Sequence, residues 1–118
     1  MPLPARFDMP VWAGNTFRRI FVFKDGAGDP LDISGSKLVF RCSSATGVIR
    51  KDTDDGTGFT ITDAVNGTAE LILEVEDTRS LPAGEVRYEI ELWSGTEQLS
   101  LLFGVLNVTV WVNDDVDP

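Results

Sequence analysis

The sequence predicts an all-β fold, an antiparallel two-layer sandwich of about seven short strands with one helical turn. Apolar and polar residues alternate with a period of two in one segment after another, as they do in strands with one buried face. Clusters of Gly, Asp, Asn, Ser and Pro separate these segments about every 8–12 residues. No stretch has a helical period long enough to supply the crossover helices of a parallel sheet.

The first half of the chain holds four expected strands. Residues 17–24 (FRRIFVFK) are partly apolar at both odd and even positions, which predicts a strand covered on both faces. Residues 24–35 are dense in Asp, Gly and Pro and predict a loop. The other expected elements are strands over residues 37–42, 47–51 and 59–62, with a turn over 52–58.

The second half begins with a hairpin signal, Asn66-Gly67, between two expected strands. Residues 69–75 alternate cleanly and predict a half-buried strand. Residues 76–81 predict the helical turn, with Asp77 or Thr78 as the candidate cap and Pro82 and Gly84 ending it. Residues 86–93 then predict the next strand, followed by a turn over 94–96.

The closing stretch, residues 97–112, changes the parity of its apolar positions. Leu101 and Phe103 lie at odd numbers, whereas Val108 and Val110 lie at even numbers, and Gly104 stands between the two sets. A period-2 pattern changes parity only where one extra residue is inserted, so we expect a β-bulge at Gly104. These four apolar side chains are expected to be buried, which places Trp111 on the opposite face.

Length and proline content divide the chain into three parts. At 118 residues the chain is one domain with a single core. Residues 1–13, where prolines are frequent, are expected to be an extended N-terminal arm or an edge strand. Residues 14–113 form the expected sandwich domain, and residues 114–118 an acidic tail.

Composition and charge disfavour several functions. The net charge of -9 argues against nucleic acid as a partner, and no apolar run is long enough to span a membrane. The chain has no histidine and no recognisable catalytic motif, so we expect no enzyme activity and no cofactor. The lone Cys42 lies in a strand-like segment and is expected to be a buried structural thiol.

The acidic run Asp52-Thr53-Asp54-Asp55-Gly56 has some likeness to a calcium-binding loop. The match fails in detail, because Gly56 comes one position early and Thr62 falls near the place where a glutamate ligand is needed. A solvated turn is therefore expected, with a weak calcium site as the minor alternative, and no metal site is predicted.

Four aromatic residues are the candidate interface residues: Trp93, Trp111, Trp12 and Phe7. Trp93 shares its strand face with charged residues, and Trp111 shares a face with Asn107 and Thr109. An aromatic side chain on a polar face is typical of residues that anchor interfaces. The alternative interpretation is that each tryptophan covers the rim of its own core, and Trp12 is expected to pack the N-terminal arm against the domain.

Several turn and strand segments occur in an order and spacing that resemble a known family. The family comprises tailed-phage and prophage structural modules, including the immunoglobulin-like N-terminal domain of baseplate upper proteins and short standalone tail-region proteins. It usually has Asp where Asn15 stands, and often Tyr directly after Gly84. The segments that carry the resemblance are residues 14–19 (GNTFRR), 23–25 (FKD), 28–35 (GDPLDISG), 78–90 (TRSLPAGEVRYEI) and 102–108 (LFGVLNV).

The resemblance implies an immunoglobulin-like sandwich without catalytic residues. It also implies a virion protein, made in the bacterial cytoplasm, that associates with itself or with other phage tail or baseplate proteins. The alternative from another class is a carbohydrate- or receptor-binding module that uses its surface aromatics. An extracellular adhesin domain is disfavoured, since no export signal is visible at the start of the sequence.

Overall fold

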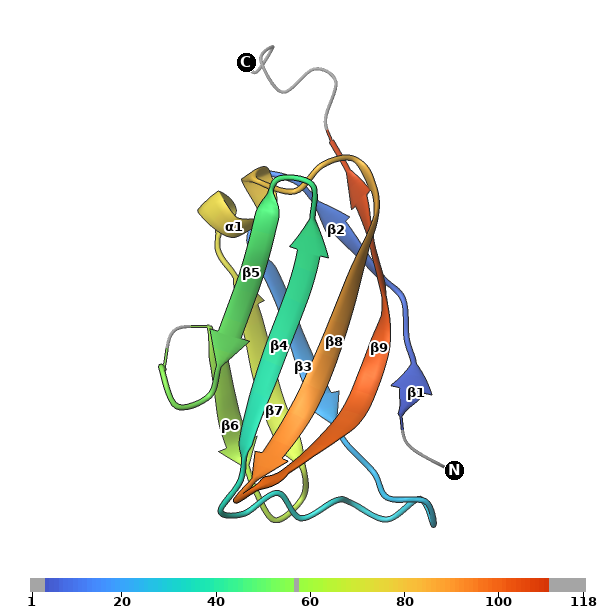
Figure 1. Ribbon diagram of the computed structural model, residues 1–118, viewed down its shortest axis with the longest axis vertical. Helices are drawn as coiled ribbons and strands as arrows, with labels where there is room; N and C mark the ends of the chain where they lie inside the picture. The colour runs from blue at the N-terminus through green and yellow to red at the C-terminus, as the bar shows by residue number, and fades with distance from the viewer. Residues whose placement is uncertain (1–3, 57, 111–118) are drawn as a thin grey trace.

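Two β-sheets pack face to face in the computed structural model, which describes residues 4–56 and 58–110 (Figure 1). All seven predicted strands are present, and this confirms the all-β sandwich prediction. The six-stranded sheet has the order β1-β9-β8-β4-β5, with β2 also pairing with β9, and the three-stranded sheet has the order β3-β7-β6. The strands are β1 (Ala5–Arg6), β2 (Met9–Trp12), β3 (Phe17–Val22), β4 (Lys37–Ser44), β5 (Gly47–Asp52), β6 (Phe59–Asp63), β7 (Thr68–Leu73), β8 (Gly84–Ser94) and β9 (Glu97–Thr109).

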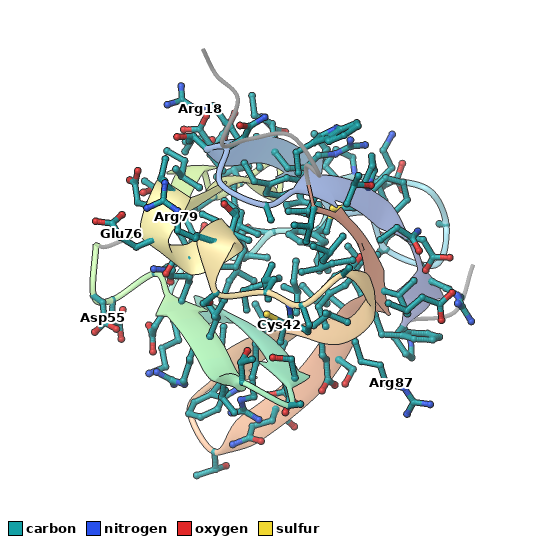
Figure 2. The ribbon with its side chains drawn as sticks, turned by 90° about the horizontal axis from the view of Figure 1, so that it is seen from above. Arg18, Cys42, Asp55, Glu76, Arg79 and Arg87 are labelled. Atoms are coloured by element: carbon teal, nitrogen blue, oxygen red, sulfur yellow. The ribbon has the colours of Figure 1, made fainter. Side chains whose placement is uncertain are left out.

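The core lies between the inward-facing rows of the two sheets. Phe40 on β4, Leu71 on β7 and Ile90 on β8 are fully buried, in keeping with the alternation in each segment. Cys42 also lies between the sheets (Figure 2), and its burial raises the pKa of the thiol to about 11. The thiol is therefore protonated and inert at neutral pH, as expected for a structural cysteine.

Residues 5–12, within the expected N-terminal arm, form two short strands of the six-stranded sheet. Both β1 and β2 run parallel to β9, with Ala5 opposite Leu102 and Val11 opposite Val108. The side chains of Met9 and Val11 are buried in the core. The N-terminal segment thus closes one edge of this sheet and supplies part of its hydrophobic core.

The predicted bulge exists, but its predicted position is wrong. Ile90 is opposite Leu102 and Glu91 is opposite Ser100, so the extra residue is Leu101 and not Gly104. Because the parity changes before Phe103, that side chain points to the outer face and is 40% exposed. Val110 is exposed as well, whereas Leu101 and Val108 are buried as predicted.

Gly104 has a different role, since it makes room for the N-terminal segment. It pairs regularly with Tyr88. A Cβ atom here would overlap the carbonyl oxygen of Phe7 and would lie 2.7 Å from Oδ1 of Asp8. Glycine is therefore required by the close approach of a neighbouring backbone and not by a bulge.

The helical turn is α1 (Val75–Arg79), one residue earlier than predicted, and its cap differs from both candidates. Glu74 is the N-cap residue, and its backbone N–H donates to Oδ2 of Asp77 at 2.9 Å. Thr78 lies inside the helix and is fully buried. Among the described residues, no helix is long and apolar enough to cross a membrane.

One expectation about β3 is wrong. Its inward row packs on the core, but its other face is uncovered, with Ile20 62% and Val22 52% exposed. The three-stranded sheet has no layer over its outer face in the described part of the chain (Figure 1). On β3, apolar residues on both faces therefore mean that one face packs on the core and the other is exposed, and not that both faces are covered.

Candidate interaction surfaces

Trp93 lies on the outer face of β8, beside cationic side chains of β4 and β5. The Nζ atom of Lys37 lies 4.8 Å from the ring centroid, and the guanidinium carbon of Arg50 lies 5.6 Å from it. The indole N–H donates to Oε1 of Glu91 at 2.9 Å. Cations over an indole ring attract its π electrons, so this half-buried tryptophan is held in a fixed orientation.

Asp52 is the buried carboxylate that organises these cations. Its Oδ2 lies 3.1 Å from both Lys37 Nζ and Arg50 Nη2, and its Oδ1 accepts the N–H of Asp54 at 2.8 Å. Burial opposes ionisation, but this hydrogen bond and the two cations outweigh it and hold the pKa of Asp52 below its usual range. The charge of Asp52, the first carboxylate of the acidic run, is thus already balanced by Lys37 and Arg50 of the same chain.

A hollow of about 560 Å³ adjoins Trp93 at the end of the sandwich where β8 turns into β9. Asp54 contributes a carboxylate to it, 3.8 Å from Lys37 Nζ. In residues 4–56 and 58–110, no three His, Cys, Asp or Glu side chains lie close enough together to hold a metal ion. The lining is Gly35, Ser36, Lys37, Asp54, Trp93 and Gly95.

A larger hollow, about 680 Å³, lies over β4, β8 and β9 on the same outer face. Arg41 and Arg87 line it, and Figure 2 shows Arg87 directed away from the sandwich. Neither arginine has a carboxylate at ion-pair distance in the described part of the chain. Glu89, which also lines the hollow, instead accepts a hydrogen bond from the Ser100 hydroxyl. Phe103 adds an exposed aromatic ring.

The structure separates the three candidate interface residues that it describes. Phe7 is half-buried against the core, and the guanidinium carbon of Arg19 lies 4.7 Å from its ring centroid. Trp12 is exposed at the end of β2, opposite Thr109. Trp93 lies on the outer face of the six-stranded sheet, and Trp111 is outside the described residues. The structure therefore gathers no aromatic cluster from Phe7, Trp12 and Trp93, and their role as interface residues stays a prediction.

An exposed surface on β3 was not expected from the sequence. Ile20 and Val22 are among the most exposed large apolar residues of the described chain. A signal was present, because the strand is apolar at both parities and one of the two faces can lack a cover. Sequence alternation alone does not show which strand has a neighbouring layer.

No protein-family model matches the chain, and no curated protein matches it significantly in sequence. Among solved structures, the fold is similar to one described as the N-terminal domain of phage TP901-1 ORF48. The TM-score is 0.55 at 13% identity, over 86% of this chain and 82% of that one. The two domains therefore share a fold.

Proposed function

We propose that this protein is a non-enzymatic structural module of a phage or prophage virion, a tail or baseplate component that acts through contacts with other protein subunits. The observation that carries the proposal is the shared fold with a phage protein domain over 86% of the chain. The ordered turn segments that resemble the immunoglobulin-like domain of baseplate upper proteins independently favour the same class.

The surfaces of the molecule suit protein contacts better than chemistry. In the described part of the chain, its exposed features are single aromatic rings, guanidinium groups with no carboxylate at ion-pair distance, and an uncovered sheet face, which are typical of interfaces. The cysteine is buried with a pKa of about 11, so it is no nucleophile. Arginine and aromatic residues are also the types most enriched at interface hot spots.

The proposal is tested by measuring whether the protein co-purifies with virions or tails. Virions or tails from the phage or lysogen that encodes the chain are banded on a density gradient, and the fractions are probed with an antibody raised against this chain. We expect the protein in the particle band at a fixed ratio to tail proteins. Its recovery only among free proteins at the top of the gradient would overturn the proposal.

Variants then locate the contact on the particle. Arg87→Glu alters the larger hollow, whereas Glu76→Lys changes an exposed charge on α1 on another part of the molecule and serves as the control. Loss of incorporation for Arg87→Glu alone would place the contact at that hollow. Normal incorporation of both variants would place it elsewhere on the molecule.

Carbohydrate binding through surface aromatics is the less supported function. Sugar rings stack on open aromatic faces, but the ring of Trp93 already has Lys37 and Arg50 close over it. A glycan array with the wild-type protein, Trp93→Ala and Trp111→Ala distinguishes the two functions. Tryptophan-dependent binding to a glycan would favour the carbohydrate module.

A further inference from the structure

We propose that the free edge of β3 pairs with β3 of a second copy, antiparallel about a twofold axis through Ile20, so that two three-stranded sheets become one six-stranded sheet. This inference rests on the proposed structural function and identifies one partner and one surface for it. The surface comprises the edge and outer face of β3 at Arg18, Ile20 and Val22, which we call the β3 edge.

The backbone of the β3 edge is available for pairing. β3 pairs only with β7 in the described part of the chain. The N–H of Phe23 donates to Gly67 O on the β7 side at 2.8 Å. Residues that face one neighbour alternate along an antiparallel strand, so Phe21, Arg19 and Phe17 face β7. The backbone groups of Arg18, Ile20 and Val22 must then point to the free edge.

A bond on the other side of β7 supports this assignment. Ile72 N–H donates to Gly58 O, beside β6, at 2.6 Å. Ile72 therefore faces β6, and its neighbour Leu71 faces β3, where it stands opposite Arg19. The two hydrogen bonds therefore agree on which residues of β3 direct their backbone groups towards β7 and which direct them towards the free edge.

Charged residues usually protect an edge strand, but both arginines of β3 have a partner within their own chain. The Nε atom of Arg18 lies 3.8 Å from Oε2 of Glu70, a residue on β7, the strand next to β3 on the side away from the free edge. The guanidinium of Arg19 stacks over the ring of Phe7. Arg19 is therefore held by the N-terminal segment, and the exposed Arg18 side chain stands on the outer face of the sheet, where it leaves the backbone edge accessible.

The side-chain pattern of β3 fits a second copy in one register. With Ile20 opposite Ile20 of the second copy, Arg18 stands opposite Val22, and Thr16 stands opposite Lys24. Apolar β-branched residues meet at the centre, and no like charges face each other. Three residue pairs can exchange about six backbone hydrogen bonds in this register.

Neighbouring registers are less favourable. A shift by two residues in one direction puts Arg18 opposite Lys24 of the other copy, which is repulsive. The opposite shift puts Arg18 opposite Ile20 and removes the apolar contact at the centre. A segment that is self-complementary in one register favours a second copy over an unrelated strand.

Two other sheet edges, β2 and β6, carry features that hinder such pairing. Pro10 on β2 has no backbone N–H to donate. The pairing of β6 is irregular between Ile61 and Asp63.

Sedimentation velocity over a concentration series tests the proposal. We expect the wild-type protein to form dimers, and Ile20→Lys to weaken dimerisation at least about 10-fold, since two charges then meet at the axis. Val48→Lys is the matched control, because Val48 on β5 is equally exposed, at 62%. Each copy carries a net charge of -9, so dimerisation should strengthen as salt screens this repulsion.

Cysteine scanning tests the register. Directly opposed residues in a hydrogen-bonded pair lie about 5.5 Å apart at Cα, within the range that a disulfide spans. Ile20→Cys should therefore form disulfide-linked dimers under diamide, whereas Arg18→Cys and Val22→Cys should crosslink efficiently only when mixed with each other. Native Cys42 is buried and stays unreactive.

Two results would overturn the inference: a wild-type protein that stays monomeric at all concentrations, or a dimer that Ile20→Lys leaves unchanged. Circular dichroism verifies that each variant is folded. A strict monomer that still bands with virions would overturn the β3 pairing but leave the proposed function standing. A dimer that never enters particles would overturn the proposed function but leave the β3 pairing standing.

Discussion

The hydroxyl of Tyr88 on β8 donates a hydrogen bond to the carbonyl oxygen of Phe7, 81 residues away in the chain. Phe7 lies between β1 and β2, where its own N–H donates to Phe103 O at 2.8 Å. Oδ1 of Asp8 accepts the N–H of Val105 at 3.0 Å. Three hydrogen bonds therefore fasten the connection between β1 and β2 to the six-stranded sheet.

Tyr88→Phe should loosen this attachment without opening a cavity. The change leaves the carbonyl oxygen of Phe7 without its buried donor, and we expect a loss of about 1 kcal/mol in the free energy of unfolding. Urea denaturation measures the loss, and amide hydrogen exchange at Phe7 should accelerate more than exchange in β4. Equal exchange at both places would contradict the proposed attachment.

Alkaline pH should weaken the fold through the same residue. Burial, with a smaller contribution from the nearby Asp8 carboxylate, raises the pKa of Tyr88 to about 12. In the unfolded chain the phenol of Tyr88 ionises near pH 10. The stabilisation from its neutral form is therefore complete below about pH 10 and is lost as the pH rises towards 12. Tyr88 is the only tyrosine, so ultraviolet absorbance of the phenolate reports its titration directly.

The control for alkaline unfolding is Tyr88→Phe, which should lose less stability over this interval than the wild-type protein. Cys42 titrates in a similar interval, with a pKa of about 11. A Cys42→Ala background removes that second contribution. An identical alkaline loss with and without Tyr88 in this background would contradict the assignment.

Gly104→Ala should separate the N-terminal segment from the sheet. The added methyl group would overlap the backbone at Phe7, and such overpacking costs about 1–3 kcal/mol. Denaturant unfolding measures the loss. In a chain that lacks residues 1–8 the same substitution should cost almost nothing, so a similar cost in both backgrounds would show that the methyl group disturbs β9 itself.

The sequence predicted the strands well because each strand has its own period-2 pattern. It placed the bulge at Gly104, since a glycine at a parity change is a common signal. The real insertion is at Leu101, and the pattern could not reveal it because Leu101 and Leu102 are equally apolar and both buried. The need for glycine at position 104 comes instead from the close approach of Phe7 and Asp8, which are distant in sequence.

The candidate surfaces were less predictable for the same reason. Trp93 was correctly placed on the face of β8 that carries charged residues, but its neighbours Lys37 and Arg50 come from other strands. The exposure of Ile20 depends on which sheet lacks a covering layer. Contacts between segments far apart in the sequence leave no local pattern to read.

Asp52→Asn should destabilise the protein at neutral pH. The variant keeps the shape of the side chain but leaves Lys37 and Arg50 beside a neutral amide, which we expect to cost about 2 kcal/mol because the two cations remain partly exposed to water. Urea denaturation at pH 7 measures this cost. Asp54→Asn is the control, since that carboxylate is exposed and more distant from Lys37.

The effect of Asp52 should also depend on pH. Its folded-state pKa is lowered, so the stabilisation is present above the unfolded value of about 3.9 and is lost as the pH falls through the folded value. Stability curves of wild type and Asp52→Asn should therefore converge in acid. Curves that stay parallel would show that the ionised carboxylate is not the stabilising group.

Thr78→Val tests the connection between α1 and the crossover from β2 to β3. The Thr78 hydroxyl donates to Asn15 O at 2.8 Å and accepts the N–H of Gly14 at 3.0 Å. Valine keeps the volume but leaves both backbone groups unpaired in a part-buried place, so we expect a loss of about 2 kcal/mol. Ser80→Ala removes an exposed hydroxyl bond to Asp77 O and should cost less than about 0.5 kcal/mol. If both variants lost the same stability, the hydroxyl of Thr78 would contribute only to its own helix.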